Sequence, residues 1–345
     1  MIPGNTIDLR SDTKTQPSPG MRAAMAAAAV GDEQANEDPS VNALCERVAA
    51  LLGKKKGLLL PSGTMCNLIA VMVHCRHGDE ILAADISHLM SSESGGLGLS
   101  GAMVRALPSR RGIFSGEQVT QALRPPKQNA PKSRLVHVEQ TVNRGGGSIW
   151  SLAALGDVSR AAKAGGLSVH MDGARLMNAV IASGVSAAQY GALCDSLWLD
   201  LSKGLGCPIG AVLVGNDDFM TAARAWKFRF GGAMRQAGVI AAAGLYALDN
   251  NIDRLQIDHD NASLLADRLR TIPGITVLEP ETNIVFFDVG GTGMTAFDIR
   301  DQLAGDGIRI NPENSTSFRA VTHLDVDRQR IEAAAASIRR IIGRL

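Results

Sequence analysis

The sequence predicts an α/β protein with a mainly parallel central sheet and a smaller C-terminal α/β domain. The first observation is alternation, because short apolar runs of strand type are separated by helix-forming segments along most of the chain. The second is that runs such as 210–215 are apolar throughout, which is typical of strands buried on both faces of a parallel sheet. We therefore expect helices on both faces of the sheet.

Individual elements follow from local residue patterns. Strands of the central sheet are expected at residues 79–85, 102–108, 134–139, 167–172, 196–201 and 210–215. Helices are expected from residue 21, from Pro39, and at residues 65–74, 118–123 and 151–165, with the lysines of 54–56 at a solvated helix end. A helical stretch at 238–255 is expected to lead into strands at 274–280, 284–289 and 307–312 and helices at 294–304 and 326–341.

Length and composition limit the classes of protein. The 345 residues suggest two domains, predicted at 1–250, including the N-terminal segment, and at 251–345. A net charge of +1 provides no strong field, so neither nucleic acid nor a membrane surface is expected as a partner. Because the sequence shows no signal pattern and no apolar run of membrane-spanning length, cytoplasmic residence is expected. The five cysteines fit neither a disulfide framework nor a zinc site, and no metal is expected.

Lys203 stands on a glycine-rich turn between the apolar runs 196–201 and 210–215. On such a turn its ammonium would be partly desolvated, which lowers the pKa and makes the neutral amine available to attack carbonyls. The alternative is an ordinary lysine in a surface loop.

Asp172 ends the expected strand 167–172, one α/β unit before Lys203. Pyridoxal phosphate chemistry requires such a pair, because the lysine forms an imine with the cofactor and the carboxylate keeps the pyridine nitrogen protonated. A helix cap is the alternative for Asp172 alone. Segment 61–64, a Ser-Gly-Thr turn at a helix start, could bind the cofactor phosphate, although taken alone it favours a plain N-cap.

Eight motifs, in order along nearly the whole chain, carry a family resemblance. They are IDLRSDT at Ile7, EDPSVN at Glu37, PSGTMCN at Pro61, SHLMSSESGG at Ser87, DGARLMNAV at Asp172, SKGLGCPIGAVLVGN at Ser202, GGAMRQAG at Gly231 and RAVTHLDV at Arg319. Together they resemble the L-threonine aldolases, pyridoxal phosphate enzymes of the aspartate aminotransferase fold (fold type I). The resemblance implies that fold and pyridoxal 5'-phosphate as the cofactor.

The resemblance also implies roles for the residues that bind the cofactor. Lys203 would be the Schiff-base lysine and Asp172 the partner of the pyridine nitrogen. Gly63 and Thr64 would hold the phosphate at the helix start, with Ser202 as a further contact.

On the substrate side, the resemblance implies that His88 stacks on the cofactor ring and is the candidate base. Ser11, Arg175 and Arg319 would bind the substrate carboxylate, with Arg175 also near the cofactor, because an arginine pairs with a carboxylate through two hydrogen bonds. The implied reaction cleaves L-threonine or L-allo-threonine to glycine and an aldehyde: the carboxylate contacts align the Cα–Cβ bond, and a base removes the β-hydroxyl proton.

The sequence departs from the family pattern at three places. Val142, which is expected to be a substrate-binding residue, replaces a histidine that contacts the substrate hydroxyl in the family, and Ala35 replaces a frequent tyrosine. Phe228 occupies a position often held by lysine, between Lys227 and Arg229. We therefore expect an aldehyde portion that is larger and less polar than acetaldehyde, as in L-phenylserine.

Other functions remain open at this stage. The same fold supports β-elimination, racemisation or transamination of a related amino acid, or a sugar aminotransferase. A non-catalytic binding or assembly protein would be expected to lack Lys203 or Asp172. Since related enzymes are dimers or tetramers, the resemblance also implies a homo-oligomer that acts on a small amino acid.

Overall fold

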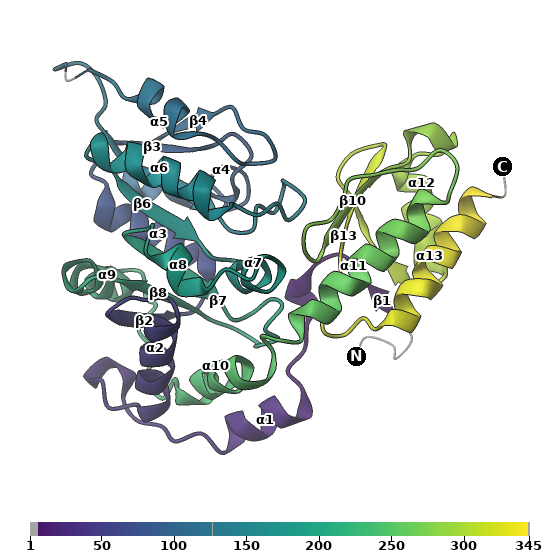
Figure 1. The fold of residues 1–345 in the computed structure, drawn as a ribbon. Coiled ribbons are helices and arrows are strands. Elements are labelled where there is room, and N and C mark those ends of the chain that lie inside the picture. The colour runs from purple at the N-terminus through teal and green to yellow at the C-terminus, as the bar shows by residue number, and fades with distance from the viewer. Residues whose placement is uncertain (1–5, 126, 344–345) are drawn as a thin grey trace.

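The computed structural model describes residues 6–125 and 127–343, which form two packed parts (Figure 1). The larger part contains a seven-stranded sheet in the order β2-β8-β7-β6-β5-β3-β4. Its strands are β2 (Lys56–Leu60), β3 (Glu80–Ala84), β4 (Met103–Leu107), β5 (Ser133–Glu139), β6 (Ser168–Asp172), β7 (Ser196–Asp200) and β8 (Ala211–Gly215). The six predicted strands are confirmed, and the sheet is mainly parallel because only β8 runs against its neighbours.

Strand β2 corrects one prediction. Residues 54–56 were expected at a solvated helix end, yet Lys56 begins a strand that pairs along its whole length with β8. The reason is the apolar run that follows, since Leu58, Leu59 and Leu60 are all buried between the helical layers.

Helices cover both faces of the sheet, as predicted. Alternate strand residues point to opposite faces, so Leu199 packs with one helical layer and Trp198 with the other. The first layer contains α2 (Pro39–Leu51), α5 (Gly116–Ala122), α6 (Leu152–Ala164), α7 (Leu176–Ser183), α8 (Ala187–Gly191) and α10 (Gly238–Asn250). The second layer contains α3 (Gly63–His74), α4 (His88–Ser91) and α9 (Asp217–Arg229).

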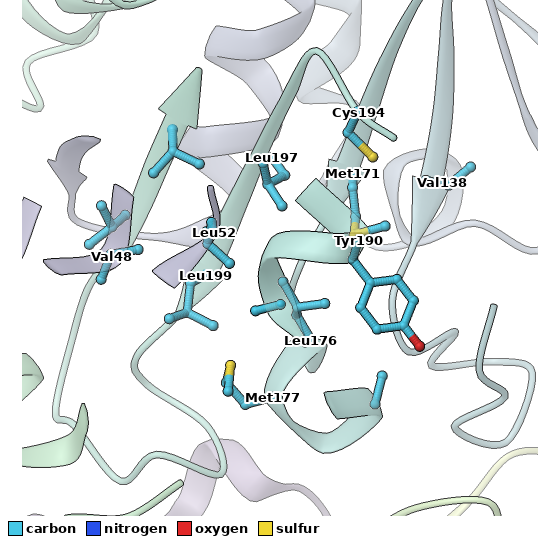
Figure 2. Packing of buried hydrophobic residues seen from close by; sticks show 14 of the residues in the cluster. Val48, Leu52, Val138, Met171, Leu176, Met177, Tyr190, Cys194, Leu197 and Leu199 are labelled. Carbon is cyan, nitrogen blue, oxygen red and sulfur yellow. The ribbon is translucent and has the colours of Figure 1, made fainter. Parts of the chain in front are cut away.

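The core of the first layer is shown in Figure 2, where Leu197 and Leu199 of β7 face Leu176 and Met177 of α7. Helix α1 (Pro19–Ala26) joins this core through Met21. The opposite face of the sheet carries a smaller apolar cluster, in which Trp198 of β7 packs with residues of α3 and α9.

The second part is built from the C-terminal residues. Its antiparallel sheet has the order β12-β13-β10-β9 and packs with α11 and α13 (Figure 1). The elements are α11 (Leu255–Arg270), β9 (Thr276–Val277), β10 (Ile284–Asp288), α12 (Ala296–Gly305), β11 (Ile308–Arg309), β12 (Asn311–Pro312), β13 (Ser317–Val321) and α13 (Arg328–Ile342). The predicted continuous helix 238–255 ends at Asn250, because Asn251 turns its side-chain amide to the carbonyl of Leu205. Strand β13 was not predicted.

The N-terminal segment packs with the C-terminal part. Strand β1 (Ile7–Asp8) pairs in parallel with β11, and Ile7 and Leu9 belong to the second apolar core (Figure 1). The side chains of Ile7 and Leu9 are therefore buried among residues that lie more than 250 positions later in the sequence. The predicted boundary near residue 250 stays a prediction, but this segment does not pack as a piece of the larger core. The first five residues of the chain lie outside the described residues.

Across residues 6–125 and 127–343, no helix has both the length and the apolar character needed to span a bilayer.

Gly173 provides a stability test of the contact between β6 and β7. A Cβ at this position would lie 1.7 Å from the carbonyl oxygen of Trp198, so the backbone would have to move. We expect Gly173→Ala to lower the free energy of unfolding by about 3 kcal/mol. Gly156→Ala is the matched control, because its Cβ would meet nothing closer than 3.5 Å within α6.

In the control, alanine is the better helix former, and we expect a gain of about 0.5–1 kcal/mol. Denaturant unfolding of both variants measures the two changes. Equal stability of the two variants would contradict the close packing at Gly173.

Candidate active site

A pocket of about 370 Å³ lies at the carboxyl ends of the parallel strands, where α/β proteins bind ligands. Nine of the residues with predicted roles line it: Ser11, Gly63, Thr64, His88, Asp172, Arg175, Ser202, Lys203 and Arg319. Residues distant in sequence are thus brought together, with Arg319 coming from β13 of the second part. The remaining lining residues are Thr13, Ser62, Asn67, Ser92, Glu93, Glu139, Asn143, Ala174, Trp198 and Asp200.

Lys203 lies three residues after the end of β7, and its Nζ is 2.6 Å from Asp200 Oδ2. Burial is the largest single influence on Lys203 and lowers its pKa, but the carboxylates of Asp200, Asp12 and Asp172 together raise that pKa, so the net direction is upward. The expectation of a lowered pKa is therefore wrong for the protein without a bound ligand. Asp200 was missed because it was counted as part of an apolar strand, although an acid three residues before the lysine was a visible signal.

Asp172 ends β6 and is 1% exposed. Its Oδ2 accepts a hydrogen bond from Asn67 Nδ2 at 2.8 Å, and its Oδ1 accepts one from the backbone N–H of Ala174 at 2.9 Å. Both oxygens are held, so the orientation of this carboxylate is fixed by the protein. A buried carboxylate with two donors can serve as a permanent partner for a cationic ring nitrogen.

The start of α3 forms an anion site beside these residues. Ser62 caps the helix by accepting from the N–H of Met65, while the N–H groups of Gly63 and Thr64, in the first turn, have no acceptor within the helix. A Cβ on Gly63 would lie 2.2 Å from the Trp198 ring, so only glycine fits here. These donors and the positive end of the helix dipole suit a phosphate group.

His88 begins α4, directly after β3 and the turn that follows it. Its Nδ1 is 2.9 Å from Glu93 Oε1, and this hydrogen bond raises the pKa of His88. With Nδ1–H held by Glu93, Nε2 is the nitrogen that can accept a proton. Ring and carboxylate atoms of His88, Glu93 and Asp172 lie within 4.8 Å of one another, so His88 is placed beside the proposed ring-nitrogen partner.

Two arginines provide the positive charge of the pocket. Arg175 is 5% exposed and binds Asp12 through Nε at 2.7 Å and Nη2 at 2.6 Å. Burial raises the pKa of Asp12, but Arg175 overcomes this and holds that pKa well below its usual range. Arg319 donates from Nη1 to Asn143 Oδ1 at 2.5 Å. Asp12 and Asn143 were not predicted, although Asp12 lies inside the recognised motif IDLRSDT and Asn143 directly follows Val142.

Glu139 is a further acid that sequence reasoning missed, after Asp200 and Asp12. It ends β5, is buried, and accepts from the N–H groups of His88 at 3.0 Å and Asn143 at 2.8 Å. Burial raises the pKa of Glu139 to about 7, with Asp172 adding to the rise and the two N–H donors opposing it. Glu139 thus ties two pocket segments to the end of one strand.

Val142 does not line the pocket, which corrects its predicted contact with substrate. It is 1% exposed, belongs to the large apolar core, and bonds through its N–H to the carbonyl of Ser148. The physical reason is burial: an apolar side chain at this position packs against Gly112 rather than facing a polar cavity. Its neighbour Asn143 lines the pocket instead.

The other departures also lie away from the pocket lining. Ala35 is exposed at the end of a 3₁₀ helix (Glu33–Ala35), and Lys227 is almost fully buried in an ion pair with Glu33. Burial lowers the pKa of Lys227. The guanidinium of Arg229 lies 4.5 Å from the ring centroid of Trp226. Lys227 is therefore engaged within its own chain.

Comparison with solved structures identifies the class of fold. The structure matches a threonine aldolase of Leishmania major with a TM-score of 0.84 at 19% identity, over 97% of this chain and 99% of that one. It matches a serine palmitoyltransferase of Sphingomonas wittichii with a TM-score of 0.76 at 18% identity, over 99% and 88% of the two chains. The fold is that of the pyridoxal phosphate enzymes of fold type I, as predicted.

Sequence comparison identifies the family. Residues 8–291 match the family described as beta-eliminating lyase. Among relatives, the low specificity L-threonine aldolase of Escherichia coli K12 is 39% identical over 98% of this chain and all of that protein. The low-specificity L-threonine aldolase 1 of Arabidopsis thaliana is 40% identical over 92% and 91% of the two chains. The chain therefore belongs to the beta-eliminating lyase family, and the predicted resemblance to threonine aldolases is confirmed.

Asp200→Asn tests the electrostatic control of Lys203. Removing the charge eliminates the main contribution that raises the pKa of Lys203, so we expect that pKa to fall by about one unit or more. The measurement is the pH dependence of Lys203 acetylation by acetic anhydride, read from the labelled peptide by mass spectrometry. Exposed Lys55 in the same digest is the internal control and should not change; an unshifted Lys203 profile would contradict the assignment.

Proposed function

We propose that this chain is a pyridoxal 5'-phosphate-dependent aldolase that cleaves L-threonine and L-allo-threonine to glycine and acetaldehyde. The observation that carries the proposal is the assembly, in one pocket, of Lys203, Asp172, the start of α3 and two arginines. Two relatives that are 39% and 40% identical and are named low-specificity L-threonine aldolases support it.

The residues present fit this cofactor. Lys203 offers the amine for its aldehyde, the buried and doubly bonded Asp172 suits its pyridinium nitrogen, and the first turn of α3 suits its phosphate. When bound, the cofactor supplies an electron sink for the carbanion that forms at the substrate Cα. The protein contributes position, charge and protons.

Ser11, Arg175 and Arg319 orient the substrate in this proposal. Arg175 uses the N–H of Nε and one N–H of Nη2 on Asp12, so the N–H groups of Nη1 and the second N–H of Nη2 remain for the substrate carboxylate. Holding the carboxylate in one place restricts rotation about the bond between the substrate nitrogen and Cα, which aligns the Cα–Cβ bond for cleavage. Arg319 comes from β13, so the substrate would be held between the two parts of the chain.

Proton transfer is assigned to His88. Its Nε2 would accept the proton of the substrate β-hydroxyl, while Glu93 holds Nδ1–H and stabilises the resulting imidazolium. Lys203 beside Asp200 is a second proton carrier, because its pKa is raised in the free pocket. Cleavage thus uses an acceptor and a donor that the fold already positions.

The pocket lining favours a short, polar substrate side chain. Most lining residues are polar or charged, with Ala174 and Trp198 as the apolar members. Because Val142 lies in the core, its replacement of histidine does not make the cavity apolar. We therefore propose threonine and allo-threonine as better substrates than phenylserine, in place of the preference expected from sequence. Assembly as a dimer or tetramer and cytoplasmic residence stay predictions.

Activity assays test the proposed reaction. The purified protein with pyridoxal phosphate is expected to release acetaldehyde and glycine from threonine and allo-threonine, and benzaldehyde from phenylserine more slowly. Lys203→Ala should lower kcat by roughly 10³-fold or more, because it removes the covalent anchor. Lys55→Ala, at an exposed lysine paired with Asp217, is the matched control and should retain activity.

Two outcomes would contradict the proposal. Release of a keto acid and ammonia would instead identify β-elimination, the reaction named in the family description. Aldehyde release by Lys203→Ala at the rate of the unchanged protein would exclude the Lys203 amine as the covalent anchor of the cofactor.

The pH dependence of the reaction tests His88 as the base. A base must be unprotonated, and Glu93 raises the pKa of His88, so kcat/KM should increase as pH rises through that pKa. Glu93→Gln can keep an acceptor for Nδ1–H but removes the negative charge. The rising limb of the plot of kcat/KM against pH should therefore move to lower pH by about one unit. A limb at the same pH in both proteins would exclude His88 as the titrating base.

A further inference from the structure

A chain of polar side chains, all buried except the half-buried His74, leads away from Asp172 through the layer between the sheet and α3. It consists of Asn67 and His74 on α3, His170 on β6 and Ser196 on β7. His170 and Ser196 are fully buried, and none of His74, His170 and Ser196 lines the pocket. Burying polar groups costs free energy unless they are bonded, so their presence in an otherwise apolar layer needs a reason.

The orientation of Asn67 can be deduced from its neighbours. The indole N–H of Trp198 can only donate, and it lies 2.7 Å from Asn67 Oδ1, so this atom is an oxygen. Asn67 Nδ2 lies 2.8 Å from Asp172 Oδ2 and 2.7 Å from Glu93 Oε1, which are both acceptors. The amide therefore has only one arrangement, with its donors toward the two carboxylates.

This arrangement determines the tautomers of two histidines. His170 Nε2 lies 3.3 Å from Asn67 Oδ1, so Nε2 must carry the hydrogen. Burial lowers the pKa of His170 well below its usual value, so the ring is neutral and Nδ1 is an acceptor. Ser196 Oγ, at 2.8 Å, then donates to Nδ1 and must accept from His74 Nε2, also at 2.8 Å.

Every hydrogen bond of the chain therefore donates in the same direction. His74 donates to Ser196, Ser196 to His170, His170 to Asn67 and Asn67 to Asp172. Aligned hydrogen bonds polarise one another, which strengthens the last donor. The dipoles all point their positive ends toward the buried carboxylate.

We propose that Asn67, His170, Ser196 and His74 are positioning residues that orient the Asp172 carboxylate toward the cofactor ring nitrogen and strengthen the hydrogen bond it receives from Asn67. The proposal rests on the function proposed above for Asp172, but the hydrogen-bond chain itself exists without the cofactor. Asn67 lines the pocket, whereas His170, Ser196 and His74 lie behind it. They act through Asp172, by stabilising the negative charge that faces the pyridinium.

The chain is tested first in cofactor-free protein labelled with ¹⁵N-histidine, because seven histidines give a tractable spectrum. We expect His170 and His74 as neutral Nε2–H tautomers. Ser196→Ala should shift the Nδ1 resonance of His170 to that of an unbonded nitrogen. Ser159→Ala is the matched control. This buried serine lies on α6, on the opposite face of the sheet from α3, and donates its hydroxyl hydrogen to the carbonyl of Leu193.

The effect on the cofactor is tested with ¹⁵N-labelled pyridoxal phosphate. In Ser196→Ala we expect the ring-nitrogen signal to move toward the neutral form and kcat to fall roughly five- to tenfold with little change in KM. Should Ser196→Ala not fold, His74→Leu removes the outermost donor and should give the same shift, reduced in size.

Three outcomes would overturn the proposal: an Nδ1–H tautomer at His170, a Ser159→Ala effect equal to that of Ser196→Ala, or a ring-nitrogen signal that no variant moves. Failure of the proposed reaction would appear separately, as loss of aldehyde release with the histidine tautomers intact.

Discussion

Asp172 is a carboxylate that the fold buries at the end of β6, and the rest of the site depends on how its charge is stabilised. An ionised acid removed from water needs donors or cations at close range. Asn67 and the N–H of Ala174 supply the donors, and Lys203 lies in the same pocket. The helix α3 contributes both Asn67 and, one turn earlier, the N–H groups of the proposed phosphate site. One helix thus sets the distance between the two ends of the proposed cofactor site.

The same need for compensation joins the two parts of the molecule. Asp12 belongs to the N-terminal segment, which packs with the C-terminal part. Its fully buried carboxylate nevertheless binds Arg175 of the larger part. Arg319 of β13 reaches back to Asn143 after β5. These contacts cross between the parts at the pocket itself, so the lining of the pocket depends on how the two parts pack together.

Sequence reasoning succeeded where a residue's role depends on its own segment. The buried strands were visible because residues such as 210–215 are apolar on both faces, and Asp172 and Lys203 were visible because each ends or follows such a strand. Strand β2 was missed because the lysines of 54–56 masked its start, and β13 because no strong apolar alternation marks it. Val142 was misjudged because a motif position does not show which side of the chain faces a cavity.

The order of apolar runs and the motifs at strand ends determined the fold class, the family, and nine of the residues that line the pocket. These features are local, because a short stretch of consecutive residues shows both that a strand is apolar on both faces and that a reactive residue lies at its end. Only the tertiary structure decided the partners: Asp200 beside Lys203, Asp12 on Arg175, and the line of donors from His74 to Asp172. Hydrogen bonds and charges act over a few ångströms between elements distant in the chain, so their pairing, and with it the pKa of Lys203, exists only once the strands and α3 are packed together.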